Sequence, residues 1–228
     1  MALSFNIVFK IASLCCRPKA LLSLGLFFVS VTSHAATLLV VGDSLGASYG
    51  LNEKDGWVQG LRNALQQHTL INGSVSGETS AGGLRRLPAL LKSSAPDVVL
   101  IELGGNDGLR GFPPQQLQNN LTKMVELATQ AGAKVLLSEV MVPPNYGPRY
   151  EKAFMAVYQQ LGQQNDVTLI PFFMREIAPY PELMQRDGIH PNKQAQPKIT
   201  AFMLPYIQTA LDTATNAANT NTTNTTAP

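Results

Sequence analysis

A serine and a histidine with a nearby carboxylate stand near opposite ends of this chain. Ser44 lies in the sequence GDSL at 42–45, directly after a short apolar run, and His190 follows Asp187 by three residues in the sequence DGIHPN. Acyl-transfer hydrolysis requires a hydroxyl nucleophile, an imidazole base and a carboxylate that orients the base. The two segments therefore predict a serine-dependent hydrolytic site, provided that the fold brings them together.

The small number of histidines narrows the choice of base. The chain has only His34, His68 and His190. His34 falls in an N-terminal segment that we expect to be removed. His68 lies at the end of an expected helix with no acidic residue beside it, and we expect it to be solvated. His190 is therefore the candidate base, because Asp187 is close enough in sequence to reach its Nδ1 atom.

Each motif also has a simpler interpretation. Gly42 to Gly46 satisfies G-x-S-x-G, the nucleophile elbow of α/β-hydrolases, but that elbow follows several strands, whereas Ser44 follows the first. Ser44 could instead cap the next helix, since serine is a favoured N-cap residue. The segment 187–192 could be a surface turn with Asn192 as a cap. The surrounding elements have to decide between these alternatives.

Apolar strand-like runs alternate with helical patterns along the chain. This alternation predicts a parallel sheet covered by helices on both faces, a single-domain three-layer α/β/α sandwich. We expect about five strands, at 37–41, 69–75, 97–103, 134–140 and 167–170. We expect helices at 57–67, 80–92, 115–130, 150–164 and 194–211.

Three glycine-bearing loops follow the first three expected strands. Right-handed crossovers place such loops along the carboxyl edge of the sheet, so Ser44, Gly77 and Asn106 should share that edge. The backbone N–H groups of Ser44 and Gly77 and the side-chain amide of Asn106 could then stabilise the oxyanion of a tetrahedral intermediate. Each residue alone is more simply an ordinary loop residue, and only their shared edge favours the hydrolytic site.

The first 35 residues have the pattern of a secretory signal. Three cations, Lys10, Arg17 and Lys19, precede or border an apolar core at 20–31, no acidic residue precedes Asp43, and small residues end the segment. We interpret 1–35 as a cleaved signal peptide, which predicts a periplasmic or secreted protein without a stable membrane anchor. An uncleaved anchor, or lipidation at Cys15 or Cys16, is the alternative.

Composition limits what the remaining chain can do. Residues 36–212 are long enough for one domain, and 213–228 are almost entirely Asn, Thr and Ala, which predicts a disordered tail. Both cysteines fall in the leader, so we expect no disulfide and no structural zinc site. Removing the three leader cations changes the formal charge from +2 to about −1 and leaves no basic stripe, which argues against a nucleic-acid partner.

Four sequence blocks together resemble a known family. GDSL at 42–45, Gly77, GGND at 104–107 and DGIHPN at 187–192 resemble, in the same order, the blocks of the SGNH (GDSL-type) hydrolases. The resemblance extends from Ala36 to about Leu211 and implies a flavodoxin-like sandwich. It also implies Ser44 as nucleophile, His190 as base with Asp187 as its partner, and Ser44, Gly77 and Asn106 as the oxyanion hole. No metal and no organic cofactor is implied.

The expected substrate depends mainly on this resemblance. Within the family the chain is most similar to bacterial periplasmic hydrolases of acyl-CoA, lysophospholipids, aryl esters and short-chain esters. We expect Leu109 and Phe112 to line an acyl groove under a loop that closes over the chain, with Pro143 and Tyr146 as the opposite wall. A carbohydrate O-acyl esterase and a non-catalytic binding domain are the competing hypotheses. We expect a small-molecule substrate and a monomer.

Overall fold

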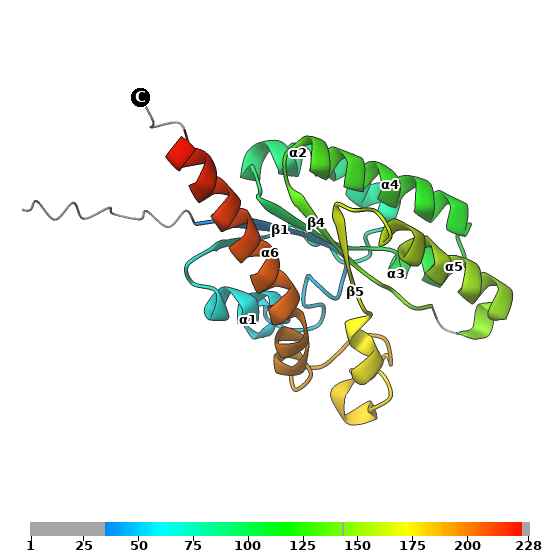
Figure 1. Cartoon of the computed structure of the whole chain (residues 1–228). Coiled ribbons are helices and arrows are strands. Elements are labelled where there is room, and N and C mark those ends of the chain that lie inside the picture. Colours follow the sequence, from blue (N-terminus) through cyan, green and yellow to red (C-terminus); the bar gives the residue numbers. More distant parts are fainter. Residues whose placement is uncertain (1–34, 143, 225–228) are drawn as a thin grey trace, which may run out of the picture. The chain divides into compact units, whose positions relative to one another are not determined.

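The computed structural model describes residues 35–142 and 144–224. Five parallel strands form one sheet, in the order β2-β1-β3-β4-β5 (Figure 1). Their bounds are β1 Thr37–Gly42, β2 Thr69–Asn72, β3 Val98–Glu102, β4 Lys134–Ser138 and β5 Val167–Ile170. The predicted parallel sheet is therefore confirmed, with strands two or three residues shorter than expected at β2, β3 and β4.

Helices cover both faces of this sheet. One face packs against α1 (Trp57–Ala64) and α6 (Gln196–Asn224), and the other against α2 (Ser80–Ser94), α4 (Pro114–Gln130) and α5 (Pro148–Leu161). Shorter elements lie in the connections: α3 (Gly105–Leu109) and the 3₁₀ turns η1 (Glu53–Asp55), η2 (Pro144–Tyr146), η3 (Phe173–Glu176) and η4 (Pro181–Leu183). The three-layer sandwich predicted from the alternation is confirmed.

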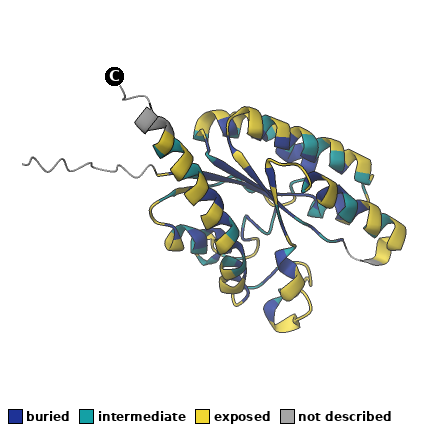
Figure 2. Cartoon of the chain, viewed as in Figure 1, coloured by how far each residue is buried: buried dark blue, intermediate teal, exposed yellow. Residues whose placement is uncertain are grey.

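The sheet is buried because side chains alternate between its two faces. In β1, Leu38 and Val40 belong to the core that includes Trp57, whereas Leu39 and Val41 belong to the core that includes Met124. Figure 2 shows buried residues along the strands and exposed residues on the outer faces of the helices. Two apolar cores thus hold the strand ends, and with them the loops that carry the candidate site, in fixed positions.

The strand order creates a crevice between β1 and β3. The chain moves outward from β1 to β2, then crosses back to β3 on the other side of β1, so the two strands form a topological switch point. Gly42 and Glu102 are partners in the parallel register at the carboxyl ends of these strands. The loops with Ser44 and Asn106 therefore start side by side, at the place where open α/β sheets bind ligands.

The C-terminal helix differs from our expectation. We expected disorder from Thr213, but α6 continues to Asn224. Leu211 is buried in the core and Ala214 packs against it, so the helix is anchored where the Asn/Thr segment begins. The Thr213 hydroxyl donates to the Thr209 carbonyl, 2.6 Å away, a bond that lets threonine satisfy its hydroxyl inside a helix. The prediction of a disordered tail is corrected for residues 213–224.

His68 also differs from expectation. Its side chain is only 4% exposed. Its Nδ1 accepts a hydrogen bond from the Ala36 backbone N–H at 3.3 Å, and its Nε2 lies 4.0 Å from an Asp212 carboxylate oxygen. No acidic residue is close to His68 in the sequence, because Asp212 belongs to α6, more than 140 residues further along the chain. His68 joins the first strand to the last helix and lies away from the candidate base, His190.

Across the helices that the structure describes, none combines the length and apolarity needed to span a bilayer. The segment interpreted as a signal peptide lies outside the described residues except for Ala35.

Candidate functional site

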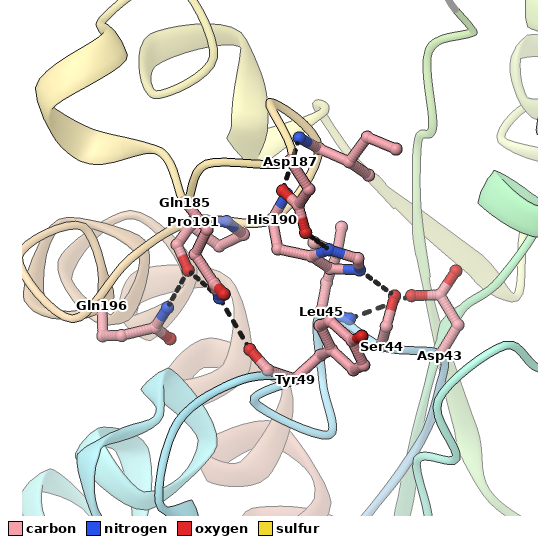
Figure 3. A network of polar contacts seen from close by, with 10 residues as sticks. Asp43, Ser44, Leu45, Tyr49, Gln185, Asp187, His190, Pro191 and Gln196 are labelled. Atoms are coloured by element: carbon pink, nitrogen blue, oxygen red, sulfur yellow. Dashed lines mark hydrogen bonds and ion pairs between the residues drawn. The ribbon is translucent and has the colours of Figure 1, made fainter.

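Ser44, His190 and Asp187 form one hydrogen-bonded chain. The His190 Nε2 atom lies 2.9 Å from Ser44 Oγ, and His190 Nδ1 lies 2.7 Å from Asp187 Oδ2 (Figure 3). Ser44 comes from the turn after β1, whereas the other two come from the loop between η4 and α6. The structure brings together the nucleophile, base and orienting carboxylate that the sequence predicted, across 146 residues of chain.

Asp187 is held in place by its own loop. Its Oδ1 atom accepts the backbone N–H groups of Ile189 and His190 at 2.9 and 3.0 Å. Gly188 has a φ of +67°, a left-handed conformation that glycine adopts at little cost. The hydrogen bond from His190 is the main reason that the pKa of Asp187 is lowered to about 2. The carboxylate therefore remains ionised and keeps the proton of His190 on Nδ1, so that Nε2 can accept one from Ser44.

Residues outside the predicted motifs connect the serine turn to the histidine loop. The Gln185 side-chain amide donates to the Tyr49 carbonyl at 2.7 Å and to the Pro191 carbonyl at 3.1 Å. The Tyr49 ring packs on the His190 ring with centroids 4.4 Å apart. Figure 3 shows Gln185 between these two segments. Sequence reasoning missed Gln185, and its only signal was its position two residues before Asp187.

The segment around Ser44 is a series of turns, not the start of a regular helix. The Ala47 N–H bonds to the Asp43 carbonyl at 3.0 Å, and the Tyr49 N–H bonds to the Ser44 carbonyl at 3.0 Å. The indole N–H of Trp57, a fully buried residue of α1, donates to the Leu45 carbonyl at 2.9 Å. These bonds hold the serine against the core and leave the helix-capping interpretation without support.

The third predicted loop places Asn106 beside the serine turn. Asn106 lies in α3, and its Nδ2 donates to Asp43 Oδ2 at 3.2 Å. Asp107, the next residue, is buried and accepts bonds from the Ser80 N–H at 2.8 Å and the Ser80 hydroxyl at 2.6 Å. Asp107 therefore ties the short helix to the start of α2 and fixes the backbone on which Asn106 is mounted.

Gly77 lies on the same edge, in a turn with left-handed backbone that glycine adopts at little cost. Its φ is +78°, and no other group comes within 4 Å of the position that a Cβ atom would occupy. The neighbouring loop is joined to the serine strand by the bond from the Val75 N–H to the Gly42 carbonyl at 3.1 Å. The Arg110 guanidinium donates to the Gly77 carbonyl at 3.3 Å, which links this loop to the end of α3. The role of the Gly77 N–H in an oxyanion hole stays a prediction.

An apolar cavity of about 540 Å³ opens beside the serine, and Ser44 and Asn106 both belong to its lining. Most of the other lining residues are apolar: Leu45, Leu109, Val140, Met141, Val142, Phe172, Met174, Ala178, Pro179, Met184 and Ile189. A groove with this lining and a few polar groups at one end is typical of sites for small apolar ligands.

The predicted substrate wall is only partly correct. Leu109 lines the cavity, but Phe112 and Tyr146 do not, and Pro143 lies outside the described residues. The Tyr146 hydroxyl donates to the Leu109 carbonyl at 2.7 Å, so Tyr146 stabilises the backbone at Leu109 without lining the cavity. The wall comes instead from the segment after β4, at 140–142, and from the segment after β5, which includes Phe172 and Met184. The sequence PFFM at 171–174 supports the family resemblance, but apolar residues scattered through a connection form no pattern that predicts a binding wall.

Comparison with known proteins agrees with this geometry. The model of the GDSL-like Lipase/Acylhydrolase family matches residues 40–196. The chain belongs to this family. The matched range includes both the serine turn and the histidine loop, so the resemblance inferred from the four blocks is confirmed, and the protein is a serine ester hydrolase.

Individual relatives of this acylhydrolase are similar over most of its length. It is 49% identical to Esterase TesA of Pseudomonas aeruginosa, over 85% of this chain and 100% of the relative. It is 48% identical to Thioesterase 1/protease 1/lysophospholipase L1 of Escherichia coli K12, over 80% of this chain and 90% of the relative. A crystal structure of TesA, 49% identical, superposes with a TM-score of 0.74 over 77% of this chain and 99% of that chain.

Proposed function

We propose that this acylhydrolase cleaves fatty acyl esters and thioesters, with acyl-CoA, lysophospholipids and aryl esters as its substrate classes, through an acyl-enzyme on Ser44. One observation carries the proposal: the Ser44 hydroxyl is hydrogen-bonded to His190 at 2.9 Å and belongs to the lining of the apolar groove. Relatives named arylesterase, in Vibrio mimicus, and thioesterase and lysophospholipase, in Escherichia coli, support these substrate classes. The apolar lining favours an acyl chain over a sugar ring.

The proposed reaction has two chemically similar steps. Ser44 Oγ attacks the carbonyl carbon while His190 Nε2 accepts its proton, and the tetrahedral intermediate expels the alcohol or thiol as His190 returns the proton. Water, activated by His190, then attacks the acyl-enzyme and releases the acid. Asp187 stabilises the imidazolium that forms in both steps, since it stays ionised.

The oxyanion of each intermediate requires fixed N–H donors. We assign this role to the backbone N–H groups of Ser44 and Gly77 and to the Asn106 amide, which belong to the loops after β1, β2 and β3 at the carboxyl edge of the sheet. Such donors act in the transition state more than in the ground state, because the negative charge develops there.

Replacing Asn106 by alanine is expected to lower kcat by about 10²–10³-fold, or about 3 kcal/mol in the barrier, with little change in KM. Steady-state hydrolysis of p-nitrophenyl esters measures both constants. Asn119→Ala, at an exposed position on α4, is the matched control and should behave as wild type. A kcat for Asn106→Ala close to that of the control would contradict the assignment.

Truncating Leu109 should reduce the hydrolysis of long-chain esters more than that of acetyl esters. Leu109 lines the groove but is 41% exposed, so we expect about a tenfold loss in kcat/KM for p-nitrophenyl laurate and almost none for the acetate. Phe112→Ala is the matched control, because Phe112 belongs to the same loop but not to the lining. Equal losses for laurate and acetate with Leu109→Ala would refute the groove as an acyl site.

We also propose that the protein is exported after cleavage near Ala35 and acts as a monomer in the periplasm or outside the cell. The basic and apolar pattern of residues 1–35 supports export. N-terminal sequencing of protein recovered from the periplasm tests the cleavage position, and light scattering tests the oligomeric state.

A further inference from the structure

Asp43 is a buried acidic residue that the proposed reaction leaves without a role. Asp43 is only 3% exposed and directly precedes Ser44, the proposed nucleophile. Asp43 Oδ1 accepts the Leu45 backbone N–H at 3.0 Å, and Asp43 Oδ2 accepts the Asn106 amide at 3.2 Å. One carboxylate thus contacts both the backbone that carries Ser44 and a candidate oxyanion donor. Figure 3 shows this carboxylate beside Ser44.

A second buried acid lies beneath Asp43. Glu102, at the end of β3, is fully inside the core, and its Oε2 accepts the Asp43 backbone N–H at 3.4 Å. Burial, and next the charge of Asp43, raise the pKa of Glu102 well above its usual range. Of the two acids, Asp43 is the one whose carboxylate contacts both the serine turn and Asn106.

Keeping the Asp43 carboxylate ionised while it is buried costs free energy. Burial raises the pKa of Asp43 to about 6, against the lowering effects of its bonds to Leu45 and Asn106 and of the nearby His190. The Asp107 carboxylate, on α3, also acts to raise it. At neutral pH, above this pKa, Asp43 is ionised, and no lysine or arginine in the described part of the chain forms an ion pair with it. Buried charges that are not paired tend to be found at functional sites.

We propose that Asp43 is a positioning residue that orients the Asn106 amide toward the substrate carbonyl. This inference rests on the proposed function, since it concerns the oxyanion hole of the same reaction. Asn106 Nδ2 carries two N–H groups, and the bond to Asp43 occupies one and leaves the other for the oxyanion. Because an ionised carboxylate can only accept, it excludes the flipped amide, whose oxygen would face the developing negative charge.

An asparagine at position 43 would reverse this selection. Its Oδ1 can take over the bond from Leu45, which leaves its NH₂ group facing the NH₂ group of Asn106. Two donors repel, so the Asn106 amide would turn and present its oxygen to both position 43 and the oxyanion. An alanine at position 43 would leave the amide unheld, without the opposing donor.

The experiment compares Asp43→Asn and Asp43→Ala with wild type and with Asp97→Asn as the matched control. Asp97 also accepts a backbone N–H, from Thr37 at 2.7 Å, but at the opposite edge of the same two strands. We measure kcat and KM on a p-nitrophenyl ester, together with thermal unfolding in mildly alkaline buffer. Each variant is also made with Asn106→Ala, in a double-mutant cycle.

Asp43→Asn should lower kcat about 100-fold, with KM changed by less than about threefold, because a transition-state donor is lost. Its unfolding temperature should equal or exceed that of wild type, since a buried charge has been removed. In the Asn106→Ala background the same substitution should cost less than about threefold, because the residue through which Asp43 acts is gone. Asp43→Ala should show a smaller loss than Asp43→Asn.

The inference is overturned if Asp43→Asn keeps a wild-type kcat, or if its effect is fully additive with that of Asn106→Ala. It is also overturned if both Asp43 variants unfold far below wild type, which would make Asp43 a structural residue. These results differ from a failure of the proposed function, in which wild type itself would hydrolyse no faster than Ser44→Ala.

Discussion

Replacing Ser44 by alanine should reduce kcat by about 10⁶-fold, the largest effect expected of any single change in this chain. The expected loss is this large because the proposed mechanism forms the acyl bond on Ser44 Oγ, the hydroxyl that lies 2.9 Å from His190 Nε2. His190→Ala should cost a similar factor. The double variant should be no worse than either single variant, because the two side chains act as one unit.

Steady-state and single-turnover hydrolysis of p-nitrophenyl esters, followed at high protein concentration, measures these losses. Ser93→Ala, at an exposed position near the end of α2, is the matched control and should retain wild-type activity. Losses that multiply in the Ser44→Ala/His190→Ala variant would mean that the two residues act independently. A wild-type rate no higher than that of Ser44→Ala would instead favour the competing hypothesis of a non-catalytic binding domain.

Replacing Asp187 by asparagine should lower kcat by about 10⁴-fold while leaving the fold intact. Asparagine can present its NH₂ group to His190 Nδ1, which moves the histidine proton to Nε2 and removes the acceptor for Ser44. The neutral amide also fails to stabilise the imidazolium. Asp212→Asn is the matched control, because the Asp212 carboxylate lies near His68, a histidine outside the candidate site.

The pH dependence of stability also reports on Asp187. The pKa of Asp187 is lowered to about 2 in the folded protein, chiefly by the hydrogen bond from His190, so the stability that the hydrogen bonds of this carboxylate contribute is present above about pH 4. That contribution is lost as the pH falls from about 4 toward 2, below the usual activity range. The role of Asp187 as the permanent partner of His190 would be contradicted if Asp187→Asn lowered kcat by less than about tenfold relative to wild type. A loss of kcat that occurred only in acid solution would contradict it as well.

The architecture was predictable because its signals are local. Apolar runs such as Asp97–Leu103 end in glycine-bearing loops, and amphipathic patterns such as that of α4 separate them. The short helix α3 was missed, since five residues of the sequence GNDGL have no apolar periodicity. The extension of α6 was missed because composition alone cannot show that Leu211 anchors the helix where its polar part begins.

The site was predictable where a motif and the topology act together. Ser44 and Asn106 follow strands that the parallel sheet places side by side, and His190 carries its partner three residues upstream. Gln185 and Glu102 could not be found in this way. Their contacts with Tyr49 and Asp43 span 136 and 59 residues, and neither contact leaves a pattern in the local sequence.

The most direct test of the account is whether an acyl group becomes attached to Ser44 during turnover. The protein is mixed with p-nitrophenyl laurate, quenched in acid within one turnover and digested, and the peptides are examined by mass spectrometry. We predict that the lauroyl group is found on Ser44, accumulates in step with the burst of p-nitrophenol, and is absent from Ser44→Ala. Hydrolysis by wild type with an acyl group on another residue, or with none at any time point, would contradict it.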